Sequence, residues 1–230
     1  MMNIFEQGLL TYLSAKQLKT IQSQHIGIAG CGGLGSNVAL TLTRCGFNTF
    51  TLLDFDTVEA SNLNRQQYTL KDIGKNKAIC AKSKLQKHNS EIKIIDYPFA
   101  LNETNYQEIV TLYDIIVDGT DSLKSRYLIN DACILLNKIM VYGALHKFEG
   151  QVSVFNYENG PSYRCLFPNT QTETEVPNCS EIGVLGVLPG VIGLLQATEV
   201  LKIITKKEDV LSGKMLCLNL LNHTQFLLQP

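Results

Sequence analysis

The feature that most constrains the fold is a run of glycines between two segments of different character. Residues 25–29 form a short apolar stretch typical of a strand, and residues 36–44 have helical character. The segment between them reads Gly30-Cys-Gly-Gly-Leu-Gly35. Because glycine allows sharp turns and the close approach of another backbone, this segment predicts a tight strand-to-helix turn.

The alternation of strand and helix continues over residues 25–144. This order predicts a Rossmann-like α/β fold, in which a mostly parallel sheet carries helices on both faces. A chain of 230 residues with 45% hydrophobic side chains is able to bury a sizeable core. After 25–29 and 36–44, the expected elements are strands at 49–53, 91–97, 114–117 and 139–144 and helices at 75–88, 103–112 and 127–137.

The pattern changes after residue 144, and we expect an elaborated, partly antiparallel C-terminal third. We interpret 1–230 as a single domain with a core at 25–144 and an extension at 145–230. Outside the core we expect an amphipathic helix at 9–23, a β-like run at 150–157, a polar linker at 158–181, an apolar helix at 184–204 interrupted by Pro189 and Gly190, and two strands within 214–229.

Charge and cysteine content argue against several classes of protein. Lys and Arg total 20 and Asp and Glu total 21, and the net charge of −1 does not favour a nucleic-acid binder or a polybasic membrane protein. The N-terminus shows no signal peptide, and the apolar stretch Ile182–Leu195 has 14 residues, fewer than the ~20 that span a bilayer. Seven scattered cysteines without CxxC spacing favour a reducing, cytoplasmic location.

The glycine turn and a later acidic residue together predict a nucleotide site. Glycines at 30, 32, 33 and 35 let the backbone approach a phosphate, and the helix that follows offers unpaired N–H groups. Asp54 comes 19 residues after Gly35, at the end of the next strand, where a carboxylate can accept hydrogen bonds from a ribose. The alternative is a structural turn with an exposed Asp54.

Two cations indicate which kind of nucleotide binds. The loop after the second strand supplies Ser61, Asn62, Asn64, Arg65 and Gln66, and the next helix begins with Lys75-Asn-Lys77. A guanidinium and an ammonium near one loop suit a triphosphate better than the diphosphate of a dehydrogenase. The alternative is that these are ordinary surface charges, which is the interpretation we favour for Lys75.

At these residues the sequence resembles the ThiF/MoeB/HesA family, whose members are similar to the adenylation domains of ubiquitin-activating enzymes. The motifs that carry the resemblance follow one another in family order over nearly the whole chain. They are Gly30–Gly35, Leu53-Asp-Phe-Asp56, Ser61-Asn-Leu-Asn-Arg-Gln66, Gly74-Lys-Asn-Lys77, Gly119-Thr-Asp121, Gly150-Gln-Val, Tyr163-Arg-Cys-Leu-Phe167 and Cys179-Ser-Glu-Ile-Gly183.

The resemblance implies ATP-dependent adenylation of the C-terminal glycine of a ubiquitin-like sulfur carrier protein that ends in Gly-Gly, with release of pyrophosphate. It implies that Gly33 faces the phosphates, Asp54 binds the ribose, Asn62 and Arg65 contact the phosphates, Lys77 holds the phosphate tail and Asp121 holds Mg²⁺. The implied nucleotide-binding set is Gly30, Gly32, Gly33, Gly35, Asp54, Asp56, Ser61, Asn62, Arg65, Gln66, Lys77, Asp121 and Ser122, and the catalytic candidates are Arg65, Lys77, Asp121 and Cys179.

Elementary chemistry agrees with this assignment. A C-terminal carboxylate has a pKa of about 3.5 and is already an anion at neutral pH, so it attacks without a general base. None of the four histidines lies in a motif. The required contribution is electrostatic stabilisation and alignment, and one carboxylate such as Asp121 suffices for Mg²⁺ that also binds phosphates and water. The alternative role for Asp121 is to cap the following helix.

Cys179 lies in a polar loop just before the apolar helix. The resemblance to the thiamin branch implies that the matching cysteine receives the activated carrier, and a thiol near a helix N-terminus ionises more readily. Glu181 opposes such ionisation, so the alternative is an unreactive loop thiol. Adenylation itself needs no cysteine.

Two departures from the family pattern affect the expected site. The usual zinc site needs two CxxC pairs, and here the first corresponds to Ser162 and Cys165 while the second is absent, so we predict no zinc. The family also begins with an arginine that reaches the partner subunit's ATP, whereas the first arginine here is Arg44. A lysine such as Lys16 is the candidate substitute, and the alternative is weak or lost activity.

Several functional hypotheses stay open. The spacing from Tyr163 to Cys179 favours a thiamin-type enzyme with a ThiS-like carrier, whereas 143–155 also resembles the molybdopterin-type branch. The further alternatives are an NAD-dependent oxidoreductase and a non-catalytic scaffold that binds a carrier through its C-terminal third. The family analogy and the apolar helix at 184–204 favour a homodimer, and a cysteine desulfurase or a thiazole synthase is a further candidate partner.

Overall fold

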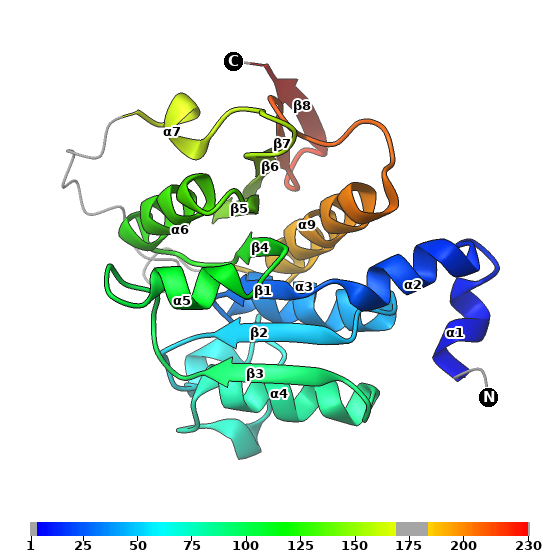
Figure 1. Cartoon of the computed structure of the whole chain (residues 1–230). Helices are drawn as coiled ribbons and strands as arrows, with labels where there is room; N and C mark the ends of the chain where they lie inside the picture. Colours follow the sequence, from blue (N-terminus) through cyan, green and yellow to red (C-terminus); the bar gives the residue numbers. More distant parts are fainter. Residues whose placement is uncertain (1–3, 169–183, 230) are drawn as a thin grey trace.

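The computed structural model describes residues 4–168 and 184–229. Within these residues the chain forms one eight-stranded sheet with the order β3-β2-β1-β4-β5-β6-β7-β8 (Figure 1). The first five strands in this order pair in parallel and the last three are added antiparallel, which confirms the predicted fold class. The strands are β1 Ile26–Ala29, β2 Thr49–Leu53, β3 Lys93–Tyr97, β4 Ile115–Asp118, β5 Ile139–His146, β6 Glu149–Phe155, β7 Met215–Asn219 and β8 Thr224–Leu228.

Helices cover both faces of the sheet. Helices α3, α4 and α9 lie on one face, and α5 and α6 lie on the other (Figure 1). The helices are α1 Ile4–Leu9, α2 Ala15–Ser23, α3 Gly33–Arg44, α4 Lys77–His88, α5 Tyr106–Thr111, α6 Leu123–Leu135, α7 Tyr163–Leu166 and α9 Val187–Thr205, with single 3₁₀ turns at η1 Ala60–Asn62 and η2 Leu70–Asp72.

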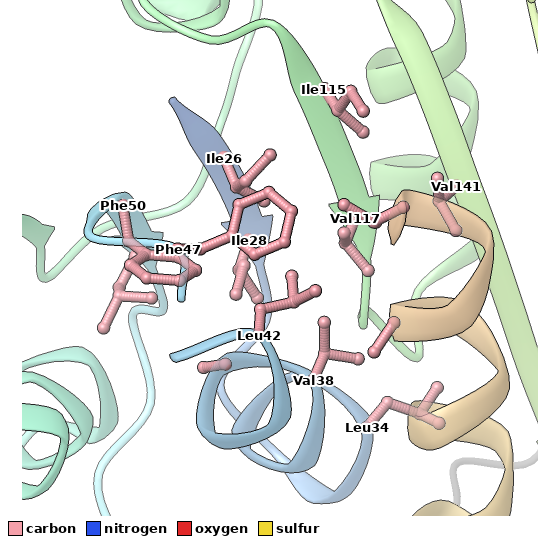
Figure 2. Packing of buried hydrophobic residues seen from close by; sticks show 14 of the residues in the cluster. Ile26, Ile28, Leu34, Val38, Leu42, Phe47, Phe50, Ile115, Val117 and Val141 are labelled. Carbon is pink, nitrogen blue, oxygen red and sulfur yellow. The ribbon is translucent and has the colours of Figure 1, made fainter. Parts of the chain in front are cut away.

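The central strands β1, β2 and β4 are almost entirely buried because helices cover both faces of the sheet there. Successive side chains of a strand point to opposite faces, so each central strand contributes to two separate cores. Ile115 and Val117 of β4 pack with α3 and α9, whereas Ile116 between them packs with α5 and α6. Figure 2 shows the first of these cores, where Val38 and Leu42 of α3 meet the residues of β1 and β4.

The structure corrects three expected elements. The segment expected as a polar linker at 158–181 contains the short helix α7 at Tyr163–Leu166. The helix expected at 9–23 is two helices, because Ser14 caps a new helix by accepting a hydrogen bond from the Gln17 N–H at 3.2 Å. The helix expected at 184–204 is not interrupted by Pro189. This proline occupies the third position of α9, within the first turn, where no intrahelical N–H bond is required.

Helix α9 also has the length and composition of a membrane span, over 19 residues. In the structure it packs against α3 and the sheet, and half of its most apolar window is buried there. This packing accounts for the apolar residues of its buried half.

The order of the strands in the sheet determines where the site lies. In the parallel part of the sheet, β2 and β3 follow β1 on one side, and β5 follows β4 on the other. The crossover connections therefore leave the neighbouring strands β1 and β4 in opposite directions. Open parallel sheets bind ligands at such a switch point, beyond the carboxyl ends of the strands. The loops that meet there begin at Gly30 after β1, Asp54 after β2 and Gly119 after β4, which are three of the predicted segments.

Candidate active site

A cavity of about 300 Å³ opens at the switch point. It is bounded by the glycine turn, by the loops that follow β2 and β4, and by the end of β5. The predicted site residues that line it are Gly30, Gly32, Gly33, Asp54, Asp56, Arg65, Gln66, Lys77, Asp121 and Ser122. The structure therefore brings together residues from separate segments of the sequence.

The glycine turn requires glycine for two different reasons. Gly30 has φ = +86°, a conformation that side chains rarely adopt, and Gly35 would place a Cβ atom 1.8 Å from the Gly30 carbonyl oxygen. Gly35 is thus a packing residue, and it does not line the cavity. Helix α3 begins at Gly33 with no side-chain cap, so its N-terminus offers N–H groups to an anion.

Asp54 is held rigidly at the end of β2. Its Oδ2 accepts a hydrogen bond from the Cys31 N–H at 2.7 Å and its Oδ1 accepts one from the Asp56 N–H at 2.9 Å. Burial raises the pKa of Asp54, and these two hydrogen bonds act in the opposite direction. Each carboxylate oxygen can accept a second bond, so the group suits two neighbouring hydroxyls.

Lys77 is the first residue of α4 and is buried beside the cavity. Its Nζ lies 2.7 Å from Asp56 Oδ2. The buried Tyr68 hydroxyl donates to the Cys31 carbonyl at 2.6 Å and lies 3.1 Å from the Lys77 carbonyl, so it joins the glycine turn to the start of α4. Burial raises the pKa of Tyr68, which keeps the hydroxyl a donor.

Arg65 reaches the cavity because the loop before it is folded on itself. Its Nη1 donates to the Ser61 carbonyl at 2.8 Å and to Asn64 Oδ1 at 3.0 Å. Two predicted ligands, Ser61 and Asn62, do not line the cavity. Asn62 accepts a hydrogen bond from the Glu59 N–H at 3.1 Å and Ser61 donates to Glu59 at 3.1 Å, so both side chains serve the loop that supports Arg65.

Asp121 is exposed and lines the cavity at the loop after β4. The following helix is capped by Ser122, whose Oγ accepts a hydrogen bond from the Ser125 N–H at 3.3 Å, so the alternative capping role does not belong to Asp121. Within residues 4–168 and 184–229, Asp121 forms no hydrogen bond or ion pair. A single carboxylate free of protein partners fits Mg²⁺, which takes its remaining oxygens from phosphates and water.

The sequence did not draw attention to three charged or titratable residues of the cavity wall. Arg126 of α6 lies behind the Asp121 loop, while His146 ends β5 and Lys147 lies in the turn between β5 and β6. Arg126 is buried and pairs with Asp118 at 2.8 Å. Burial lowers the pKa of Arg126 but the Asp118 carboxylate raises it, with a net upward shift. The signal that was available is the nearness of Arg126 in the sequence to Asp121 of the Gly119-Thr-Asp121 motif.

The remaining predictions fall elsewhere. Cys179 lies outside the described residues. Ser162 Oγ is 3.4 Å from the exposed Cys165 Sγ, and this hydrogen bond lowers the pKa of Cys165. No group of three or more His, Cys, Asp or Glu side chains suited to a metal ion occurs in the part of the chain that the structure describes. Lys16 lies on the surface of α2 and does not line the cavity.

Comparison with known proteins gives consistent matches over nearly the whole chain. A sequence model of the ThiF family matches residues 6–229. A probable molybdopterin-synthase adenylyltransferase of Porphyra purpurea is 43% identical over 96% of this chain and 61% of its own length. A sulfur carrier protein adenylyltransferase of Thermus thermophilus is 40% identical over 91% of this chain and 80% of its own length.

Solved structures share the fold. The crystal structure of E. coli MccB with ATP superposes on all of this chain and 72% of its own, with a TM-score of 0.84 and 22% identity. At this identity the likeness concerns the fold alone. The chain spans about half the length of several curated relatives that it matches.

Proposed function

The chain belongs to the ThiF family, and on that premise we propose that it is an adenylyltransferase that uses ATP to activate the C-terminal carboxylate of a ubiquitin-like sulfur carrier protein. The observation that carries the proposal is that Asp54, Arg65, Lys77 and Asp121 line the same cavity. In this reaction a carboxylate oxygen of the carrier attacks the α-phosphorus of ATP. The bond from that phosphorus to the bridging oxygen breaks, and pyrophosphate leaves with the bonding electrons.

The residues of the cavity suit this chemistry. The carrier carboxylate is already ionised at neutral pH, so the site needs alignment and positive charge rather than a proton acceptor. The N-terminus of α3, the Arg65 guanidinium and the Lys77 ammonium provide that charge near a triphosphate. Bound Mg²⁺, held through Asp121, would supply further neutralisation of the phosphates. We assign to Asp54 the hydrogen bonds from the ribose.

The same residues argue against a dinucleotide oxidoreductase. A glycine turn and an acid at the end of β2 also suit NAD, but a diphosphate requires few cations. Here a guanidinium and an ammonium line the cavity with the glycine turn. The two relatives described above are both called adenylyltransferases, which supports nucleotide transfer over hydride transfer.

We propose a ThiS-like carrier of thiazole synthesis as the first candidate substrate and the molybdopterin-synthase carrier as the alternative. The spacing between Tyr163 and Cys179 supports the first, and the name of the Porphyra relative supports the second. The test incubates the purified protein with ATP, Mg²⁺ and each carrier, and measures the intact mass of the carrier. Addition of AMP to only one carrier identifies the branch. Addition to neither carrier contradicts the proposal.

Cys179 provides an independent test of the branch. A Cys179→Ala variant should still adenylate the carrier in both branches, because the attack on ATP uses no thiol. In a thiamin-type enzyme the same variant should lose the transfer of sulfur to the carrier. Loss of adenylation itself would show that this cysteine acts in the step we assign to the cavity.

A further inference from the structure

A buried ion pair lies directly behind the loop that carries Asp121. The Nε of Arg126 donates to Asp118 Oδ2 at 2.8 Å. Asp118, the last residue of β4, is 0% exposed, and Arg126 is 8% exposed. Arg126 also stacks on the Tyr142 ring, with 5.1 Å between its guanidinium carbon and the ring centroid. The pair is therefore held in one geometry on several sides.

Both members of this pair also bind the backbone of the same loop. The second Arg126 nitrogen, Nη2, donates to the Thr120 carbonyl at 2.8 Å. The second Asp118 oxygen, Oδ1, accepts from the Thr120 N–H at 2.9 Å and from its hydroxyl at 2.6 Å. Thr120, which immediately precedes Asp121, is thus held through its N–H and hydroxyl donors and through its carbonyl oxygen.

The loop is anchored to the glycine turn and to α9 as well. The Gly119 N–H donates to the Ala29 carbonyl at 2.8 Å, and a Cβ atom on Gly30 would lie 2.6 Å from the Gly119 oxygen. The buried Gln196 of α9 donates to the Asp118 carbonyl at 2.8 Å. The position of Asp121 relative to the proposed phosphate site is therefore set by this network.

Stability alone does not account for such an arrangement. Burial of two opposite charges costs desolvation that their attraction often fails to recover, and apolar residues of similar volume commonly stabilise a fold as well or better. Asp118 does not line the cavity, so it has no access to a ligand. Its contribution to the site can act only through the residues that it holds.

We propose that Asp118 and Arg126 are positioning residues, which hold the Gly119–Ser122 loop so that the Asp121 carboxylate meets the metal ion of a bound nucleoside triphosphate. The inference rests on the proposed function. It predicts that loss of the pair weakens the metal-dependent part of ATP binding, whereas the contacts of ATP with the glycine turn, Asp54 and Lys77 remain.

The experiment measures ATP binding by titration calorimetry, once with excess MgCl₂ and once with EDTA. The ratio of the two affinities gives the gain due to the metal. Two variants probe the pair. Asp118→Asn keeps an oxygen for Thr120 and removes the charge opposite Arg126. Arg126→Lys keeps the charge but replaces the planar guanidinium, which binds Asp118 and Thr120 through two separate nitrogens, with a single ammonium. Asp121→Asn serves as the comparison in which the metal-binding carboxylate itself is lost.

A matched control exists on the same helix. Asp131 of α6 pairs with Arg164 at 2.6 Å, and both side chains are at least 40% exposed. Asp131→Asn removes an ion pair of the same type outside the cavity, and it should leave ATP binding unchanged under both conditions. Circular dichroism establishes which variants are folded. If Asp118→Asn does not fold, the decision rests on Arg126→Lys, which retains the opposite charges.

We expect the metal to raise the affinity of the wild-type chain on the order of tenfold or more. In Asp118→Asn this gain should fall toward that of Asp121→Asn, with the affinity in EDTA unchanged. In Arg126→Lys, whose residue also lines the cavity, the gain should fall to the same extent whatever happens to the affinity in EDTA. Retention of the full gain, or an equal loss with and without metal, would overturn the inference. A wild-type chain that does not bind ATP in either condition would instead overturn the proposed function, and the inference with it.

Discussion

The Nζ atom of Lys77 lies 2.7 Å from Oδ2 of Asp56, and the lysine side chain is 9% exposed while that of the aspartate is 48% exposed. Asp56 follows β2 and Lys77 begins α4, so the pair joins two elements at the wall of the cavity. The salt bridge thereby holds a long flexible side chain at the cavity wall before any nucleotide binds. Pre-orientation of this kind reduces the conformational entropy lost on binding.

Replacement of Lys77 should therefore impair the reaction strongly. Lys77→Ala removes a partly desolvated cation, and the loss of one preorganised electrostatic contact typically lowers kcat on the order of 10²–10³-fold. The neighbouring Lys75 is exposed and does not line the cavity, so Lys75→Ala is the matched control and should stay near wild type. Initial rates of carrier adenylation measure both variants. Equal rates for the two variants would show that Lys77 does not take part in the reaction.

The raised pKa of Asp54 predicts opposite effects of acid on binding and on stability. Because burial raises this pKa above the ordinary 3.8, protonation favours the folded chain. That contribution to stability is complete below pH 3.8 and is lost as the pH rises through the folded-state pKa. ATP affinity should fall with decreasing pH at the same transition, because only the ionised carboxylate of Asp54 can accept hydrogen bonds from both ribose hydroxyls of ATP.

The check compares wild type with Asp54→Asn across this pH range by calorimetry. The ratio of their ATP affinities should decrease as the pH falls, since the titration of ATP itself affects both proteins alike. A ratio independent of pH would show that Asp54 does not titrate in contact with the nucleotide.

Two glycine substitutions should change stability in opposite directions. Gly35→Ala would place a methyl group 1.8 Å from the Gly30 oxygen, a clash with rigid backbone, so we expect a loss of about 3 kcal/mol or more, or failure to fold. Gly190 lies within α9, and a methyl group added there would have no neighbouring atom within 4 Å. Gly190→Ala should stabilise the chain by roughly 0.5–1 kcal/mol through helix propensity. Urea denaturation measures both, and a stable Gly35→Ala protein would contradict the tight turn.

Tyr68→Phe should destabilise the chain by about 1–2 kcal/mol, because it leaves a buried carbonyl without its donor. The hydroxyl joins the glycine turn to α4, so we also expect weaker ATP binding. Tyr12→Phe is the control, since Tyr12 is 81% exposed. Denaturation and calorimetry together test the assignment. Unchanged values for both properties of Tyr68→Phe would show that this hydroxyl does not organise the site.

The sequence was most informative where local geometry and chemistry coincide. The Gly30–Gly35 segment predicted a strand-to-helix turn, because only glycine tolerates its positive φ and its backbone contact. The alternating apolar segments predicted the parallel sheet and, with it, the meeting of Asp54, Lys77 and Asp121 at one edge. These residues follow or begin regular elements, so their placement depends on topology more than on side-chain packing.

The features that the sequence did not reveal depend on tertiary contacts. Ser61 and Asn62 lie in the same motif as Arg65, yet their side chains turn back to Glu59, which no spacing rule indicates. The Asp118–Arg126 pair requires knowledge that the start of α6 lies behind the loop after β4. His146 enters the cavity wall through a hairpin whose register only the sheet defines.

The central claim is that one cavity holds ATP and activates a carboxylate, and exchange of radioactive pyrophosphate into ATP tests it most directly. With a carrier that ends in Gly-Gly, the wild-type protein should catalyse exchange that depends on Mg²⁺ and on a free C-terminal carboxylate, and an amidated carrier should support none. Absence of exchange with every Gly-Gly carrier, or equal exchange with the amidated tail, would contradict the account.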